Sequence, residues 1–306
     1  MRAPGEEGTM GEEIAVFRSG EGREAFLQAY EETMKLWSVP YETLEWQTDY
    51  GRCHVIASGP AEGKTVLLLH GMTGSSGLWY ATIPALQAYR TYCVDVPGDF
   101  GRSTVTRPLR DAGDCAHWID QLFEAAGADR AALIGHSMGG WLAANYALAR
   151  PERVERLALL APVGTFLPMP LLKMLRRVYP ALLLPKPKRI ERAWQWFCAK
   201  GGELHPVVMK QIIEAYTHCR IRMKVIPRVF PKEAWNGLKT PVLFLAGAEE
   251  VIYDADKAAK AAASVLPHVR TVIVSRAGHC LIAEQAELVN AELADFLDVT
   301  RRTESR

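Results

Sequence analysis

Residues 131–140 constrain the fold of this chain more than any other stretch. An apolar run there ends in the pentapeptide Gly-His-Ser-Met-Gly, and a helix-like run, residues 141–150, follows at once. A strand, a tight turn and a helix in this order are typical of a nucleophile elbow, which lifts a serine hydroxyl clear of a sheet. Because neighbouring chain passes very close to such a strained turn, glycine is expected at Gly135 and Gly139, where a Cβ atom would collide. We therefore predict that Ser137 is a nucleophile at the end of a buried strand.

Apolar and β-rich runs alternate with helical patterns along most of the chain. The alternation predicts a mostly parallel sheet with helices on both faces, and the first two strands form an antiparallel hairpin at one edge. The predicted strands cover residues 41–48, 52–57, 65–69, 92–95, 131–135, 156–160, 241–246 and 269–274, and the predicted helices cover 22–37, 114–126, 141–150 and 281–297.

The alternation stops between residues 161 and 239. This segment is rich in proline and carries helical patterns near residues 189–199 and 207–224. An inserted helical cap accounts for a segment of this length better than a structureless loop does. Within it, residues 169–190 mix leucine and methionine with lysine and arginine, a composition also found where helices touch a membrane surface. A lid whose apolar side faces a pocket is the commoner arrangement, and it is our expectation here.

These patterns divide the chain into three predicted parts. Residues 1–20, rich in glycine and glutamate, are expected to form a flexible N-terminal tail. Residues 21–162 and 236–300 form the predicted α/β core, and residues 163–235 form the predicted helical cap.

Composition excludes several classes of function. The chain has 306 residues, of which 49% are hydrophobic and 23% charged, as in an ordinary globular protein. A formal net charge of +1 gives no electrostatic case for a nucleic-acid partner. The first residues lack the apolar core of a signal peptide, and no apolar run is long enough to span a bilayer. The six scattered cysteines show no metal-ligand spacing, so we predict free thiols, no metal and a cytoplasmic location.

A serine nucleophile needs a base, and the base needs an orienting carboxylate. His279 is the best-placed base because it follows the last strand, whose end shares a sheet edge with the end of the elbow strand. His70 is expected to fix a glycine turn by hydrogen bonding, and the side chain of His136 is expected to point away from the nucleophile. The other histidines are expected to be surface or partly buried polar residues: His54, His117, His205, His218 and His268.

The carboxylate is expected in the loop after the penultimate strand. Glu250, three residues after Gly247, is our choice, with Glu249 and Asp254 as rivals. The chain order is then serine, acid, histidine, which is the order typical of this elbow.

Acyl chemistry also needs hydrogen-bond donors that stabilise an oxyanion. Removal of one such donor from a protease raises the activation free energy by about 2.7–4 kcal/mol. The backbone N–H of Met138, which opens the elbow helix, is one candidate. The second is the N–H of Met72, because His70 and Gly71 form a turn directly after the first buried strand.

With these motifs in place, the chain resembles the α/β-hydrolase family over roughly residues 40–298. The matching motifs are residues 70–74, 95–103, 135–140, 247–250 and 278–279. The chain looks most like the capped carboxylesterase and lipase-like branch. The resemblance implies an eight-stranded, mostly parallel sheet with a helical cap inserted after strand 6, and no cofactor. One departure is the acid, because Glu250 stands where aspartate is more usual in this branch.

The resemblance and the residues together predict a serine hydrolase that cleaves carboxylic esters through an acyl-enzyme intermediate. The cap suggests small to medium, moderately apolar substrates. The same three residues also serve C–C bond hydrolases, thioesterases and perhydrolases, and a binding protein without catalysis is the rival from another class. We expect a small-molecule ester as partner and no membrane contact, and the sequence leaves the oligomeric state open.

Overall fold

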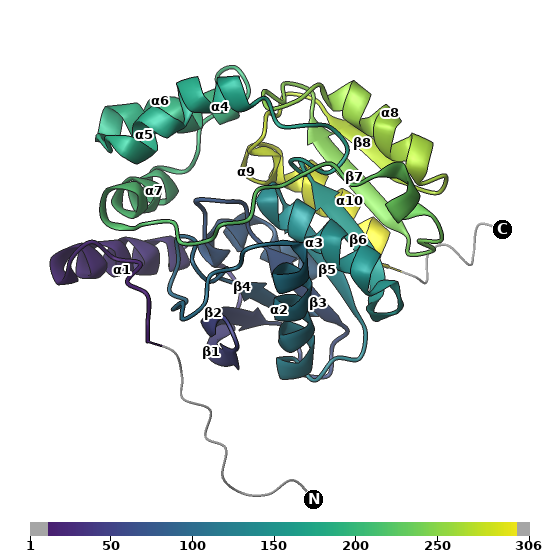
Figure 1. Cartoon of the computed structure of the whole chain (residues 1–306), viewed down its shortest axis with the longest axis horizontal. Helices are drawn as coiled ribbons and strands as arrows, with labels where there is room; N and C mark the ends of the chain where they lie inside the picture. Colours follow the sequence, from purple (N-terminus) through teal and green to yellow (C-terminus); the bar gives the residue numbers. More distant parts are fainter. Residues whose placement is uncertain (1–11, 299–306) are drawn as a thin grey trace, which may run out of the picture.

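The computed structural model describes residues 12–298 of the chain, and within them eight strands form one sheet (Figure 1). The spatial order is β1-β2-β4-β3-β5-β6-β7-β8, parallel from β4 to β8 and antiparallel where β1 meets β2 and where β2 meets β4. The predicted eight-stranded, mostly parallel sheet is confirmed. The strands are β1 Tyr41–Thr48, β2 Gly51–Ser58, β3 Thr65–Leu69, β4 Arg90–Val94, β5 Ala131–His136, β6 Val154–Leu160, β7 Val242–Gly247 and β8 Arg270–Val274.

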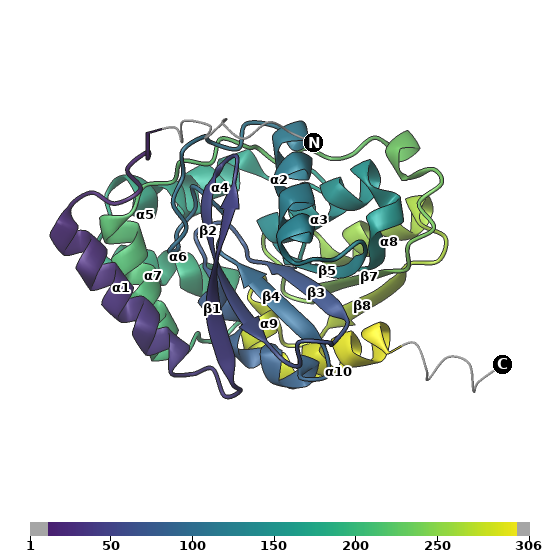
Figure 2. The same cartoon turned by 90° about the horizontal axis from the view of Figure 1, so that it is seen from below.

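Apolar side chains explain why the central strands are covered on both faces. Every residue of β5 and β7 is buried, as are the last four of β3, so these strands have no face that water can reach. Such strands read as continuous apolar runs because helices cover both faces of a parallel sheet. Here α2 (Ala112–Ala125) and α3 (Met138–Ala149) pack together on one face, and α10 (Ala286–Leu297) lies on the other (Figure 2).

The described residues form three further α-helices outside the segment between β6 and β7. They are α1 Gly20–Met34, α8 Ala255–Val265 and α9 Leu281–Glu284, with the short 3₁₀ helices η1 Ser76–Ala81, η2 Ile83–Leu86, η3 Pro151–Arg153 and η4 Lys232–Trp235. The single helix predicted over residues 281–297 is wrong. Gln285, with φ −132° and ψ 48°, leaves the helical region and separates α9 from α10.

Four α-helices lie between β6 and β7: α4 Leu171–Arg177, α5 Tyr179–Leu183, α6 Pro187–Phe197 and α7 Pro206–His218. They stand together at one end of the molecule, above the sheet (Figure 1). The helix predicted to reach residue 224 ends at His218, because Cys219 is extended and bridges to Phe17. All four fall within residues 163–235, the predicted cap, whose bounds remain a prediction.

Residues 12–19, the described part of the predicted tail, are not loose. The N–H of Ile14 donates to the carbonyl of Val105 at 2.7 Å, Val16 is buried, and Ser19 caps α1 by accepting the N–H of Gly22. These contacts place α1 against α7, so the N-terminal segment supports the cap helices. The rest of the predicted tail, residues 1–11, lies outside the described residues.

Candidate active site

The turn between β5 and α3 has the strained geometry expected of an elbow. Ser137 has φ 55° and ψ −117°, a backbone conformation that non-glycine residues rarely adopt. A Cβ atom on Gly135 would collide with the carbonyl of Gly139, and one on Gly139 would collide with the carbonyl of Leu69. Glycine at both positions therefore lets β5, α3 and β3 approach closely enough to hold the strained serine.

Three side chains from the ends of β5, β7 and β8 meet at this turn. Nε2 of His279 lies 2.8 Å from Oγ of Ser137, and Nδ1 lies 2.7 Å from Oε2 of Glu250. A carboxylate only accepts, so Nδ1 carries the hydrogen and Nε2 is free to accept the serine proton. Oε1 of Glu250 accepts the N–H of Ile252 at 2.8 Å, which fixes the carboxylate. All three side chains are buried or nearly so.

The two rival acids are engaged elsewhere. Asp254 caps α8 by accepting the N–H of Lys257 at 2.9 Å, and it pairs with the ammonium of the same lysine. These bonds lower the pKa of Asp254, the backbone bond from Lys257 most. Glu249 accepts the N–H of Lys200 at 2.8 Å. Of the three candidate carboxylates, the structure thus brings only Glu250 to His279.

His70 occupies the position predicted for it. Its Nδ1 donates to the carbonyl of Gly71 at 2.9 Å, and its Nε2 accepts the N–H of Val96 at 3.0 Å. The ring therefore ties the glycine turn to the loop after β4. Four other histidines have polar partners away from Ser137: His54 with Glu45, His117 with Asp49, His205 with the N–H of Val207, and His218 with Glu214.

The two predicted oxyanion donors lie on loops that converge at the serine. Within residues 12–298, neither the N–H of Met72 nor that of Met138 donates to a protein acceptor. A Cβ atom built on Gly71 would lie 3.0 Å from Cβ of Ser137, so the loop that carries Met72 passes directly beside the nucleophile. Buried N–H groups normally find an acceptor, and two free ones at this turn suit an oxyanion.

Sequence reasoning missed a carboxylate that holds the Met72 loop. Asp99 accepts the N–H of Thr73 at 2.9 Å and the N–H of Phe100 at 2.8 Å. Thr73 has φ 62°, so this clamp stabilises a strained residue next to the proposed donor. Burial raises the pKa of Asp99 to about 6. Its place inside the 95–103 motif was the available signal, but the sequence did not say which backbone it would contact.

The side chain of His136 has a partner that the sequence did not indicate. Its Nε2 donates to the carbonyl of His279 at 2.8 Å, and the rings of His136 and His279 lie 5.2 Å apart. Burial, followed by the nearby His279, lowers the pKa of His136 to about 3. A neutral His136 thus supports the loop that carries the proposed base.

The cap is attached to the same loop. The N–H of His279 donates to the carbonyl of Phe197, at the end of α6, at 2.7 Å. Glu284 accepts the N–H of Gly278 at 2.9 Å and the N–H of Ala199 at 2.6 Å, so one carboxylate joins the histidine loop to the cap. Nothing in the sequence marked Glu284, because a helical glutamate is usually solvated.

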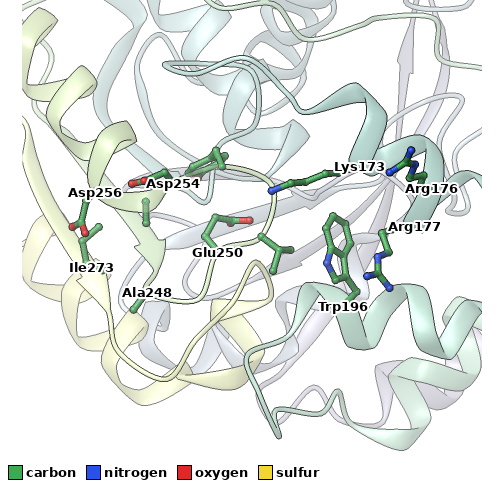
Figure 3. A pocket seen from close by; sticks show the side chains of 12 residues that line it. Lys173, Arg176, Arg177, Trp196, Ala248, Glu250, Asp254, Asp256 and Ile273 are labelled. Atoms are coloured by element: carbon green, nitrogen blue, oxygen red, sulfur yellow. The ribbon is translucent and has the colours of Figure 1, made fainter.

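A cavity of about 800 Å³ lies between the cap and the loop after β7. Basic side chains of α4, among them Lys173, face it from one side, and Glu250 and Trp196 also line it. Figure 3 shows Lys173 extending from its helix toward the loop that carries Glu250. Ser137 and His279 do not line this cavity, which therefore lies behind the carboxylate rather than in front of the nucleophile.

The described residues offer no group of three or more His, Cys, Asp and Glu side chains suited to hold a metal ion. All six cysteines lie in this part of the chain, and each is a buried free thiol. None of the helices within residues 12–298 combines the length and apolar character that crossing a bilayer requires.

The chain is similar in sequence and structure to proteins that are named carboxylesterases or esterases. Carboxylesterase YbfK of Bacillus subtilis (strain 168) is 32% identical over 280 residues, which cover 89% of this chain and 93% of that protein. The uncharacterized carboxylesterase nap of the same organism is 33% identical over 281 residues, covering 89% and 92%. The crystal structure of naproxen esterase (carboxylesterase NP) from Bacillus subtilis superposes with a TM-score of 0.86, at 32% identity, over 92% of this chain and all of that one.

A family profile gives the same result over a defined range. Residues 66–292 match the Alpha/beta hydrolase family, and this range contains Ser137, Glu250 and His279. The matched range, the sheet order and the elbow geometry agree, and the chain belongs to the alpha/beta hydrolase family.

Proposed function

We propose that this protein is a serine carboxylesterase in which Ser137 is the nucleophile, His279 the general base and Glu250 the orienting acid. One observation carries the proposal: a single buried imidazole hydrogen-bonds the serine through Nε2 and the carboxylate through Nδ1, at 2.8 and 2.7 Å. Similarity to proteins named carboxylesterases, over about nine-tenths of the chain, supports the ester as the substrate class.

Acylation begins when Oγ of Ser137 attacks the ester carbonyl carbon and its proton passes to Nε2 of His279. The carbonyl electron pair moves onto oxygen, and the N–H groups of Met72 and Met138 bind that oxyanion. The tetrahedral intermediate then collapses. The carbon–oxygen bond to the alcohol breaks, and His279 returns its proton to the departing alkoxide, leaving an acyl group on Ser137.

Deacylation repeats these steps with water as the nucleophile. His279 removes a proton from water as the hydroxide oxygen attacks the acyl carbon, and the second oxyanion occupies the same two amides. The bond to Oγ of Ser137 breaks, the serine recovers its proton from His279, and the carboxylic acid leaves. The carboxylate of Glu250 stabilises the imidazolium in both halves of the cycle.

The cap supports the proposed substrate range. The ring of Phe197 lies 5.4 Å from that of His279, and the ring of Trp196 lies 5.2 Å from that of Phe197 in a tilted arrangement. Aromatic walls of this kind favour small to medium, moderately apolar acyl or alcohol groups. The cytoplasmic location and the absence of a nucleic-acid partner stay predictions from composition.

A fluorophosphonate probe and a substrate panel test the proposal together. The probe is expected to label Ser137 in folded protein, and Ser137→Ala is expected to abolish labelling. The panel contains p-nitrophenyl esters graded by acyl length, a matching thioester and a vinylogous diketone. Turnover of the esters at the highest kcat/KM supports the proposal. If Ser137 is not labelled, the proposal that the protein is a serine hydrolase is wrong. If the diketone or the thioester is cleaved faster than the esters, the proposal that esters are the substrate class is wrong.

A further inference from the structure

The outer surface of α4 and α5 exposes an unusual amount of apolar side chain. Ten large hydrophobic side chains are exposed among the described residues, and six of them lie within residues 171–184, at 43–74% exposure. No residue of α4 is buried, and Ala181 is the only buried residue of α5. We call this surface the outer cap face, and it consists of Leu171, Leu172, Leu175, Tyr179, Leu183 and Leu184.

Helix α4 exposes both its leucines and its basic residues. Lys173, Arg176 and Arg177 line the cavity beside Glu250 and are exposed, and Leu171, Leu172 and Leu175 are exposed without lining that cavity. The expectation that the apolar side of this segment faces a pocket is therefore wrong for α4. Apolar side chain kept in water is unfavourable, and exposed apolar surface concentrated in one segment is typical of a contact surface.

Charge decides what kind of partner fits. Residues 157–190 contain no aspartate or glutamate, whereas six lysines and arginines fall within this range. None of the six forms an ion pair with another described residue: Lys173, Arg176, Arg177, Lys186, Lys188 and Arg189. A second copy docked face to face would bring the same positive charge and be repelled. An anionic surface would be attracted.

We propose that the outer cap face docks on an anionic phospholipid membrane. Helices α4 and α5 lie beside α6 at the outer edge of the molecule, on the far side of α7 from the sheet (Figure 1). The leucines reach the boundary between headgroups and acyl chains. Lys186 and Lys188, both exposed and two and four residues after Leu184, meet the lipid phosphates. These helices are seven and five residues long, too short to span a bilayer, so the proposed contact is with the membrane surface. This inference goes beyond ester hydrolysis and does not depend on it.

Flotation of the full-length protein with lipid vesicles tests the proposal. Vesicles of equal parts phosphatidylcholine and phosphatidylglycerol are expected to carry at least about tenfold more protein than vesicles of phosphatidylcholine alone, and 0.5 M NaCl is expected to abolish the difference. The double variant Leu172→Gln/Leu183→Gln is expected to lose at least about tenfold in binding. Lys186→Gln/Lys188→Gln is expected to lose the preference for the anionic lipid.

Ile226→Gln is the matched control, because Ile226 is 69% exposed outside the outer cap face. Its binding is expected to stay within twofold of wild type. Hydrolysis of a water-soluble ester without vesicles is expected to be unchanged in all variants, which shows that they fold. Equal flotation of wild type and Leu172→Gln/Leu183→Gln overturns the proposal, and so does absence of binding to the anionic vesicles. A dimer in light scattering that the double variant dissociates also overturns it, since the face then binds a second copy.

Discussion

Helices α3 and α4 follow neighbouring strands, β5 and β6, and differ in almost every physical respect. In α3, which begins at the elbow, ten of the twelve residues are buried; in α4, none is. Close packing of α3 fixes the atoms that react, whereas α4 forms one wall of a cavity and leaves its other side to the surroundings. Substitutions in the core should therefore change catalysis or folding for every substrate, while substitutions in the cap should change which substrates or surfaces are preferred.

Removal of the reacting groups should give the largest effect. Ser137→Ala and His279→Ala are each expected to lower kcat by at least about 10⁴-fold for every ester, because no other described side chain replaces the lost nucleophile or base. Burst kinetics and steady-state assays measure this. Circular dichroism is expected to match wild type, and a strong dependence of the loss on acyl length would contradict the division between core and cap.

The acid offers a matched pair of substitutions. Glu250→Gln is expected to lower kcat by about 10²–10⁴-fold, since the neutral amide cannot stabilise the imidazolium. Asp254→Asn keeps the N-cap of α8 and is expected to leave kcat within twofold. Full activity in the first variant with loss in the second would transfer the role of acid to Asp254.

The elbow glycines should report on folding rather than on chemistry. Gly139→Ala places a Cβ atom against the carbonyl of Leu69 and is expected to lower the free energy of unfolding by about 3 kcal/mol or more. Gly20→Ala, in open space at the start of α1, is expected to change it by less than about 1 kcal/mol. Urea denaturation measures both. Equal stability of the two variants would show that α3 is less tightly packed than its burial indicates.

His136 should make stability depend on pH. Its pKa is about 3 in the folded chain, below the ordinary 6.5, so the unfolded chain binds this proton first. The stabilisation is complete above pH 6.5 and falls as pH drops toward 3, by up to about 1.4 kcal/mol for each pH unit. The difference in unfolding free energy between wild type and His136→Gln isolates this contribution from that of Asp99. A difference that stays constant between pH 7 and pH 4 would refute it.

A cap substitution should give the smallest effect and the most selective one. Trp196→Leu removes the ring that packs beside Phe197, next to His279, and is expected to change the ratio of kcat/KM between long-chain and short-chain esters by about threefold to tenfold. Activity toward the shortest ester should stay within about twofold. An equal loss of activity for every ester would show that Trp196 affects catalysis in general and not the choice of substrate.

Some of this protein was predictable because the signals are local. The apolar runs of β3, β5 and β7 indicated a covered parallel sheet, and Gly135 and Gly139 indicated a turn where backbones touch. Chain order then placed the histidine and the acid at one sheet edge. Glu249, Glu250 and Asp254 could not be separated in this way, since all three sit in one loop and their hydrogen bonds depend on how that loop turns.

Hydrogen bonds between segments that are distant in the chain could not be predicted from the sequence. The clamp of Asp99 on Thr73, the bond of His136 to the His279 backbone and the bridge of Glu284 to Ala199 each join residues far apart in the chain. Their geometry arises only when the sheet and cap are assembled. The break at Gln285 lies next to one of these contacts, since the side chain of Glu284 accepts the N–H groups of Gly278 and Ala199.

The strands, the elbow and the candidate nucleophile and base could be predicted from the amino-acid order, because hydrophobic periodicity and steric exclusion act over a few residues. Only the assembled fold brings Glu250 to His279, and only there do the leucines of α4 stay exposed while its basic residues line the cavity beside Glu250. An amphipathic pattern specifies two faces of a helix, but only the packing around that helix decides which face meets the protein and which is left exposed.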